Sequence, residues 1–503
     1  MKLRGLICLL LISCGAPAYR QGYNAQWVAD TESYGTPVPL DTLASSAPLV
    51  ATSLATPASM AYGEAARKIL AHARADRSAY NKLAELTDTI GARLSGSPQL
   101  DKAITWAAAT MQRDGLTSRT EKVMVPHWQR GTIDVSLTAP ITRPLHALAL
   151  GGSIATPKAG ITARVVVVTS WEDLEAKKDQ IPDAIVLYDV PMPTGGADPF
   201  AAYGATAAYR GIGASRAAAH GAAAVLVRSV TTRSLRTPHT GSLRYVDEIS
   251  KKKIPAAAVT VEDSQLIARL AANGPVTVKL RMDPKNLPDV SSANVLGELR
   301  GREKPDEIIV LGAHIDSWDV GQGAHDDGAG CVMMMQAVAT LKQLGLTPRR
   351  TIRVVLFTNE ENGLRGAAAY AKDHAAEIPN HVFAMEADTG GFAPRALSVR
   401  AKANEPLVLA QLTDIASLAA STGLREVSPG HSGADIGALA DAGVPTAGWS
   451  TKSDAYFDIH HTDADTLDKV NPQHLADAVA AIATLAYVIA DQPDRLGAPT
   501  KTP

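Results

Sequence analysis

The sequence predicts an α/β fold in which a mostly parallel sheet is flanked by helices and interrupted by an inserted β-rich domain. From residue 294 to about 492, apolar strand-like runs alternate with helix-length segments, an alternation typical of a parallel sheet. Between about 141 and 289 the chain carries short β-branched runs separated by small-residue loops. This change of texture indicates a second folding unit inserted into the first.

Composition limits the classes of function. The chain has 503 residues, 46% of them apolar and 20% charged, which are globular values for a length of roughly three domains. Its 49 basic and 51 acidic residues give a net charge of −2, so we expect no nucleic-acid partner. Two of the three cysteines, Cys8 and Cys14, lie in the leader. Any metal site must therefore be built from His, Asp and Glu.

Residues 1–20 are predicted to be an export signal. Lys2 and Arg4 form a positive start, and the apolar run 6–12 is far shorter than the roughly 20 residues that span a bilayer. We therefore expect an exported protein, periplasmic or secreted.

Two processing routes of the leader stay open. Residues 16–18 fit ordinary signal cleavage, whereas 11–14 resemble a bacterial lipobox that would make Cys14 a lipid anchor. Residues 21–60 are rich in Ala, Ser, Thr and Pro, which indicates a tether or N-terminal arm.

Residues 61–140 are expected to form the first part of the main domain. Helical spacing covers 61–86, a second helix covers about 99–114 and stops at Gly115, and 123–126 is a candidate strand. In the insert, 141–289, a helix is expected near 208–220. Four strands are expected there, at 164–169, 184–188, 223–227 and 256–261.

The second part of the main domain is expected over 290–492. Its predicted strands are 308–312, 351–357 and 381–385. Its predicted helices are 328–344, 363–376 and a buried C-terminal helix at 478–490, and residues 493–503 form a tail.

Side chains of the kind that bind metals follow each of these three strands. The first strand leads to His314 and Asp316, the second to Glu360 and Glu361, and the third to Asp388. Ligands of open α/β sheets bind beyond the carboxyl ends of the strands. These side chains are therefore expected to lie close together at one edge of the sheet.

Two further segments extend this set. A glycine-rich loop at 321–328 carries Asp326 and Asp327 before a helix, and 458–465 contains His460 and His461. Taken singly, such residues are more often loop hydrogen-bonding groups, a helix N-cap or a solvated first turn. Their joint placement at one predicted sheet edge favours a functional site.

Gathered carboxylates repel one another unless a cation neutralises them. Imidazole and carboxylate ligands without thiolate suit zinc, with manganese or cobalt as alternatives. One carboxylate bridging two metals is an arrangement used by aminopeptidases. Of the adjacent Glu360 and Glu361, one can bind metal while the other acts as general base, and Asp316 can orient the His314 ring.

Five segments together resemble the zinc-dependent metallopeptidases of family M28. They are 88–98, 125–131, 312–328, 385–390 and 460–466, and the resemblance extends from about 79 to 491. It implies a zinc aminopeptidase-like fold with an inserted protease-associated domain and a homodimer. The resemblance also implies a carboxypeptidase-like activity on dipeptides with free ends.

The resemblance also implies a role for each site residue. His314 and Asp388 would hold the first of two zinc ions, Glu361 and His461 the second, and Asp326 would bridge both. Glu360 would be the general base and Asp316 would orient His314. The choice between His460 and His461 is one of register, and the following threonine favours His461. Asn359 departs from the small residue expected before the glutamate pair.

Residues 430–434 (GHSGA) resemble a serine-hydrolase nucleophile elbow. The fifth residue is Ala rather than Gly and no strand is expected before it, so a serine hydrolase is disfavoured. Ser432, Asp435 and His460 are instead candidate substrate-binding residues, with Asp435 placed to meet a substrate amine.

The expected function is that of a di-zinc exopeptidase acting on dipeptides or short peptides with free termini. A metal-bridging hydroxide would attack the peptide carbonyl, and Glu360 would take and return the proton. Two alternatives stay open: a metal-bound, non-catalytic binding protein of the same fold, and a one-zinc acyltransferase like glutaminyl cyclase. Zinc stoichiometry would separate these functions.

Overall fold

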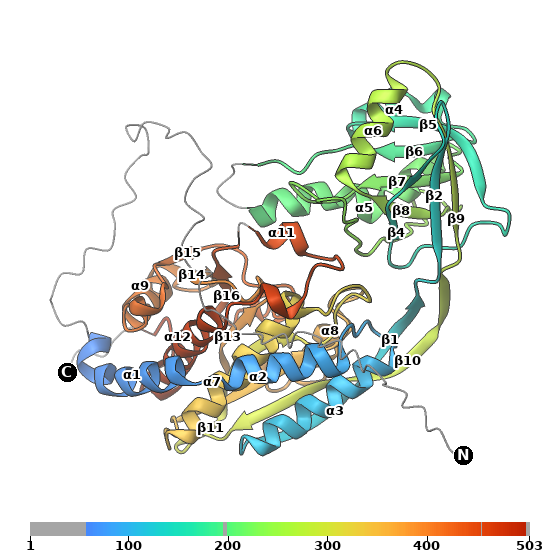
Figure 1. The fold of residues 1–503 in the computed structure, drawn as a ribbon. Coiled ribbons are helices and arrows are strands. Elements are labelled where there is room, and N and C mark those ends of the chain that lie inside the picture. Colours follow the sequence, from blue (N-terminus) through green and yellow to red (C-terminus); the bar gives the residue numbers. More distant parts are fainter. Residues whose placement is uncertain (1–56, 195–198, 454, 499–503) are drawn as a thin grey trace, which may run out of the picture. The chain divides into compact units, whose positions relative to one another are not determined.

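The computed structural model describes residues 57–194, 199–453 and 455–498. The predicted leader, Cys14 and most of the predicted arm lie outside these residues. The described residues contain two eight-stranded sheets (Figure 1).

The first sheet belongs to the main domain, and its inner strands are parallel. In spatial order its strands are β1 (Thr117–Gln129), β10 (Lys285–Leu299), β12 (Arg350–Phe357), β11 (Lys304–His314), β13 (His381–Ala387), β16 (Thr446–Thr451), β14 (Pro394–Arg400) and β15 (Glu426–Pro429). The pairs β12–β11, β11–β13 and β13–β16 are parallel. The β1–β10, β10–β12 and β14–β16 pairs are antiparallel, so the mixed α/β fold is confirmed with antiparallel additions toward both edges.

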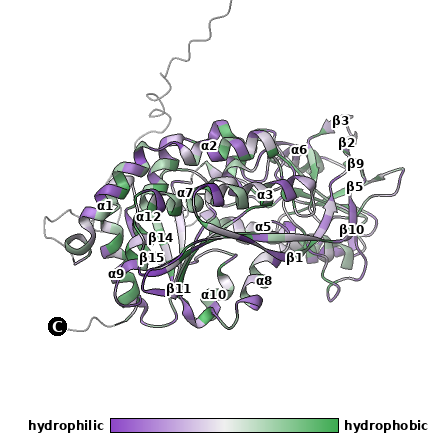
Figure 2. Cartoon of the chain, turned by 90° about the horizontal axis from the view of Figure 1, so that it is seen from below, coloured by the Kyte–Doolittle hydropathy of each residue, from purple (hydrophilic) through white to green (hydrophobic). Residues whose placement is uncertain are grey.

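Helices cover both faces of this sheet, as Figure 2 shows from below. One face carries α1 (Pro57–Ala75), α2 (Ser78–Glu85), α3 (Pro98–Arg113), α7 (Ala329–Gln343), α9 (Glu405–Ser417) and α12 (Pro472–Asp491). The other face carries α8 (Arg365–Asp373) and α10 (Gly437–Asp441). Alternate residues of β11 serve the two cores: Ile309 and Leu311 pack on the first side, and Ile308 and Val310 on the second.

Helix α12 is the one described helix long and apolar enough to cross a membrane. Most of it is buried within the protein, against α1, α7 and β12. It is therefore a core helix, which agrees with the buried C-terminal helix expected from the sequence.

The second sheet lies between β1 and β10 in the chain, and we call residues 133–282 the inserted segment. Its strand order is β3 (Arg143–Leu145), β2 (Ile133–Ala139), β9 (Thr277–Met282), β5 (Ile161–Val168), β6 (Ile185–Tyr188), β7 (Ala224–Arg228), β8 (Ala256–Val259) and β4 (Ala147–Ala149). Strands β5 to β8 are parallel. The segment also carries α4 (Trp171–Ala176), α5 (Pro199–Ala219) and α6 (Val261–Ala271), so it is more helical than the β-rich unit expected.

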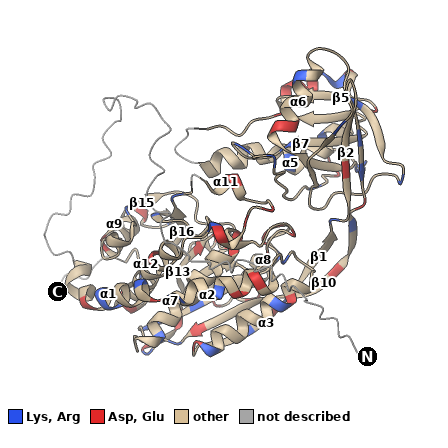
Figure 3. Ribbon diagram, viewed as in Figure 1, with Lys and Arg blue, Asp and Glu red and all other residues tan. Residues whose placement is uncertain are grey.

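Strands β1 and β10 connect the two sheets as a long antiparallel ribbon (Figure 1). The sequence indicated only a short strand at 123–126, because the first residues of both strands, 117–122 and 285–291, are largely exposed and show no apolar period. In Figure 3, Lys and Arg residues are interspersed with Asp and Glu residues over the whole described chain, in keeping with a net charge of −2.

Candidate metal centre

The ends of three neighbouring strands place the predicted ligands at one edge of the first sheet. Strand β11 ends at His314, which is in register with Phe357 at the end of β12. Strand β13 is in register with β11 through Glu386 and Gly312, so Asp388 follows directly at the same edge. This register is the physical reason why residues more than 70 positions apart meet.

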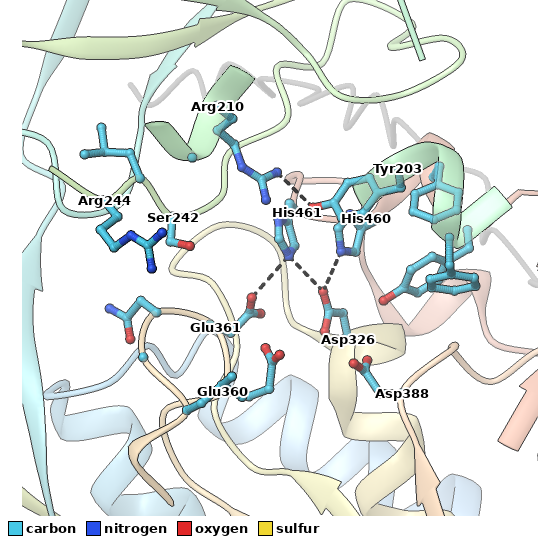
Figure 4. A pocket seen from close by; sticks show the side chains of 18 of the residues that line it. Tyr203, Arg210, Ser242, Arg244, Asp326, Glu360, Glu361, Asp388, His460 and His461 are labelled. Carbon is cyan, nitrogen blue, oxygen red and sulfur yellow. Dashed lines mark hydrogen bonds and ion pairs between the residues drawn. The ribbon is translucent and has the colours of Figure 1, made fainter. Parts of the chain in front are cut away.

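The five predicted ligands form a connected cluster with Asp326 at its centre, and Figure 4 shows four of them, Asp326, Glu361, Asp388 and His461. His314 Nε2 lies 3.1 Å from Asp326 Oδ1 and 3.5 Å from Asp388 Oδ1. His461 Nε2 lies 3.3 Å from Asp326 Oδ2 and 3.1 Å from Glu361 Oε2. One carboxylate thus separates a His–Asp pair from a His–Glu pair.

The cluster has the properties of a cation site. His314 Nε2 and Asp388 Oδ1 are buried polar atoms without a hydrogen-bond partner. Burial, with the nearby Asp326 carboxylate, raises the pKa of Glu361 to about 7, and burial also raises the pKa of Glu360 well above its usual range. Buried acids crowded in this way require compensating positive charge. Imidazole and carboxylate donors without thiolate fit zinc.

His460 and His461 stack with ring centroids 3.6 Å apart. His460 Nε2 lies 3.4 Å from Asp326 Oδ2, whereas His461 contacts both Asp326 and Glu361. This geometry favours His461 as the metal ligand, and it places His460 in the wall of the cavity above the cluster.

The inserted segment orients His461. The Nδ1 atom of His461 lies 3.2 Å from the main-chain oxygen of Thr240, and the Thr240 N–H donates to the His461 carbonyl at 3.0 Å. The Thr240 hydroxyl in turn donates to the Ala149 carbonyl at 3.1 Å and accepts from Arg130 at 3.0 Å. Sequence reasoning missed Thr240 because it lies 221 residues from His461 and carries no motif.

Asp316 has a different contact from the one expected. His314 Nδ1 lies 3.1 Å from the main-chain oxygen of Asp316 and 3.9 Å from its carboxylate. The carboxylate instead accepts the Glu360 N–H at 3.0 Å and the Ser95 hydroxyl at 3.3 Å. The main-chain carbonyl of Asp316 thus faces the His314 ring, and its side chain holds the backbone of Glu360.

Three further buried residues support the loops of the site and were not assigned from the sequence. Asp327 accepts the His314 N–H at 3.1 Å. Asp465 accepts the N–H of Asp326 at 3.1 Å. The guanidinium of Arg93 donates to the main-chain carbonyls of residues 315, 322 and 323 at 2.7, 2.8 and 3.0 Å. Arg93 and Asp465 lie inside segments 88–98 and 460–466, so the segments were recognisable although these two roles were not.

A cavity of about 640 Å³ opens over the cluster, between the two parts of the chain. The main domain contributes Asp326, Glu360, Glu361, Asp388 and His460 to its wall. The inserted segment contributes Phe200, Tyr203, Arg210, Ser242 and Arg244, none of them identified from the sequence (Figure 4). Their positions depend on how two sheets pack together, which no local pattern records.

The candidate substrate-binding residues differ in position. A second cavity of about 420 Å³ shares Asp388 with the first and is lined by Gly433 and Ala434 but not by Ser432 or Asp435. The buried Ser432 hydroxyl accepts from the Thr446 hydroxyl at 2.7 Å. Asp435 is buried, and both its carboxylate oxygens lack a hydrogen-bond partner. Ser432 is thus engaged within the core, and Asp435 lies behind the cavity wall.

Sequence comparison relates the chain to peptidases. The profile of peptidase family M28 matches residues 294–486. Carboxypeptidase Q from Homo sapiens is 37% identical over 439 residues, which are 86% of this chain and 90% of that protein. Carboxypeptidase Q from Xenopus laevis is 38% identical over 440 residues, with 86% and 91% covered.

Solved structures show the same fold. A peptidase M28 precursor from Shewanella amazonensis superposes with a TM-score of 0.82 at 36% identity, covering 88% of this chain and all of that one. A zinc aminopeptidase from Bacillus subtilis superposes with a TM-score of 0.61 at 22% identity, covering 83% of this chain and 96% of that one. The second likeness concerns the fold alone.

Proposed function

The chain belongs to peptidase family M28 and is a metallopeptidase, and we propose that it is a di-zinc exopeptidase acting on dipeptides or short peptides with free termini. The observation that carries this proposal is the cluster around Asp326. This cluster places one histidine and one further carboxylate on each side of the Asp326 carboxylate. The chain matches proteins named carboxypeptidase Q over most of its length. This similarity supports the proposal that its substrates are peptides with a free carboxyl terminus.

In this proposal His314 and Asp388 would hold one zinc ion, Glu361 and His461 would hold the other, and the Asp326 carboxylate lies between the two pairs. Zinc ions bound there would supply an activated water and a Lewis acid for the developing oxyanion. The carbonyl of Thr240 fixes which nitrogen of His461 faces the cluster, and the carbonyl of Asp316 does the same for His314.

Glu360 is the proposed general base. It lines the cavity beside the ligands, and its main chain is fixed by the Asp316 carboxylate. From this position it can accept a proton from the attacking water and deliver it to the leaving amine. The cavity walls of His460, Tyr203 and Phe457 exclude water from one side of the reacting bond.

The test is zinc content and amino-acid release by the mature protein. We expect two zinc ions per chain, cleavage of free dipeptides and sparing of an N-acetylated dipeptide. Glu360→Gln should lower kcat by about 10²- to 10⁴-fold without changing zinc content, whereas Glu64→Gln, on the exposed surface of α1, should change neither. Bound zinc without hydrolysis of any dipeptide would instead favour the non-catalytic binding protein, and one zinc with acyl transfer would favour the cyclase-like function.

Three further features belong to the proposal. The inserted segment would be a protease-associated domain, the protein would be a homodimer, and the leader would export it with or without a lipid on Cys14. Light scattering of the purified protein tests the dimer, and mass spectrometry of the mature N-terminus tests the two processing routes.

A further inference from the structure

Asn359, directly before the proposed base Glu360, has a left-handed backbone conformation. Its φ is +68°, and its side chain is completely buried. Residues other than glycine rarely adopt such a φ, and asparagine does so more readily than most because its short amide can form local hydrogen bonds. Since a small residue is expected at this position, the buried amide is an addition to the expected pattern.

The Asn359 amide uses all of its hydrogen-bonding groups. Its Nδ2 atom donates to Ser95 Oγ at 3.0 Å and to Asn362 Oδ1. Its Oδ1 atom accepts the main-chain N–H of Arg365 at 3.3 Å, and its own main-chain carbonyl accepts the N–H of Leu364 at 2.6 Å. Asn359 therefore closes the turn that leads from β12 into α8.

The contact with Ser95 connects Asn359 to the support of Glu360. The Ser95 hydroxyl donates to the Asp316 carboxylate at 3.3 Å, and the other oxygen of that carboxylate accepts the Glu360 N–H at 3.0 Å. Asn359, Ser95 and Asp316 are all buried, and hydrogen bonds linked in a buried network reinforce one another. The peptide group between residues 359 and 360 is thus held on one side by the Asn359 amide and on the other by Asp316.

The packing of Gly363 also depends on Asn359. Residues 360–364 line the cavity over the metal centre. A Cβ atom at Gly363 would lie 2.3 Å from Asn359 Oδ1, and the three nearest atoms to it all belong to Asn359. Gly363 itself has no positive φ, so the Asn359 side chain is what opposes an alanine there. The cavity wall beside Glu360 is therefore packed against the Asn359 amide.

We propose that Asn359 is a positioning residue for Glu360, which it holds through Ser95 and Asp316 so that the Glu360 side chain faces the cavity. This inference rests on the proposed function, in which Glu360 is the general base. A reacting group misplaced by about 1 Å can cost about 100-fold in rate. Glu361 is held separately, because its carboxylate accepts the Trp318 N–H at 3.1 Å. Loss of the Asn359 amide should therefore affect kcat and leave zinc binding intact.

The kinetic test compares Asn359→Gly with Asn404→Gly. Asn359→Gly keeps the left-handed backbone accessible and removes the amide. Asn404 also has a positive φ, +52°, and its amide donates to the Gly497 carbonyl at 2.9 Å beside α9, outside the cavity wall. With a free dipeptide, Asn359→Gly should lower kcat by about 10- to 100-fold at unchanged KM and zinc content, and Asn404→Gly should change none of these. Equal kcat values for the two variants, or a loss of zinc in Asn359→Gly, would overturn the positioning role.

Gly363 allows a rescue experiment. Gly363→Ala should displace the Asn359 amide and lower kcat to about the same extent as Asn359→Gly. Because the clash is with the Asn359 side chain, adding Gly363→Ala to Asn359→Gly should lower kcat no further. A double variant whose loss in kcat is the product of the two single losses would contradict the packing of this pair.

Hydrogen exchange separates this inference from the peptidase proposal. Exchange of the Glu360 main-chain N–H is measured on metal-free protein and needs no substrate. Asn359→Gly should exchange this amide about 10-fold faster, as expected for the loss of one hydrogen bond, and Asn404→Gly should leave it unchanged. Faster exchange supports the positioning role even if the zinc-loaded protein cleaves nothing. An unchanged rate would refute it whatever the activity.

Discussion

One methyl group at Gly241 is expected to weaken zinc binding although Gly241 is not among the proposed ligands. A Cβ atom there would lie 2.2 Å from Cζ of Arg210, and Gly241 has a φ of +142° that other residues rarely adopt. Carbon atoms pack at about 3.5–4.0 Å, so Gly241→Ala must displace the Arg210 guanidinium, which hydrogen-bonds the Thr240 carbonyl, by roughly 1 Å or more, and its positive φ strains the backbone beside Thr240. Residue 240, directly before it, carries the carbonyl that lies 3.2 Å from His461 Nδ1.

The magnitude follows from that contact. A donor–acceptor distance of 3.2 Å that grows by about 1 Å is no longer a hydrogen bond. Loss of a partner that orients a metal-bound histidine typically costs about 10- to 100-fold in metal affinity. We therefore expect the weaker of the two zinc ions to be lost from Gly241→Ala at a chelator concentration about 10- to 100-fold lower than from wild type.

The assay is competition with a chromogenic zinc chelator, read without any substrate. Gly204→Ala is the matched control, because it adds the same methyl group to α5 of the inserted segment where nothing lies within 4 Å. Wild-type zinc affinity in Gly241→Ala, at a melting temperature close to that of Gly204→Ala, would refute the claim that the inserted segment orients His461. Loss of both ions together with a collapse in melting temperature would indicate general unfolding instead.

Three further predictions test other parts of the chain. Asp388→Asn should retain one zinc ion per chain in place of two, measured by metal analysis, and two retained ions would remove Asp388 from the ligand set. Arg93→Met should lower the free energy of unfolding by about 4–6 kcal/mol, because three buried carbonyls lose a charged donor; a loss below about 1 kcal/mol in chemical denaturation would contradict this account. His374 donates to the carboxylates of Glu121 at 2.9 Å and Glu377 at 3.0 Å, and these hydrogen bonds raise its pKa above the ordinary 6.5. Its stabilisation is therefore complete below pH 6.5 and is lost as the pH rises through the folded-state pKa. His374→Gln should therefore cost about 1 kcal/mol at pH 6 and less at pH 9, and equal losses at both values would contradict the sign.

Much of the main domain could be predicted because its signals are local. Buried parallel strands are continuous apolar runs, and the predicted 351–357 matches β12 (Arg350–Phe357) within one residue. Helix α7 (Ala329–Gln343) was predicted at 328–344. Four of the five proposed ligands follow a strand or precede a helix, so the order of elements already places them at one edge of the sheet, whereas His461 was assigned from the resemblance of segment 460–466.

Contacts between segments distant in the chain could not be predicted. Arg244 belongs to a loop without a motif, and only the packing of the inserted segment on the first sheet brings it to the cavity. The sequence also could not show that His314 Nδ1 lies nearer the main-chain carbonyl of Asp316 than its carboxylate, because both groups belong to the same residue. The carboxylate contacts the backbone N–H of Glu360 instead, and no spacing in the sequence indicates that contact.

The main domain and the inserted segment contribute to the site from different kinds of element. Metal ligands must be held within a fraction of an ångström, and three of the proposed ones, His314, Glu361 and Asp388, follow the ends of buried parallel strands. The arginines of the cavity wall lie instead on a helix and a loop of the inserted segment. Thr240 connects the two parts, because its carbonyl accepts from Arg210 and faces His461 Nδ1. A displacement of Arg210 would therefore act on the same carbonyl that orients a proposed zinc ligand.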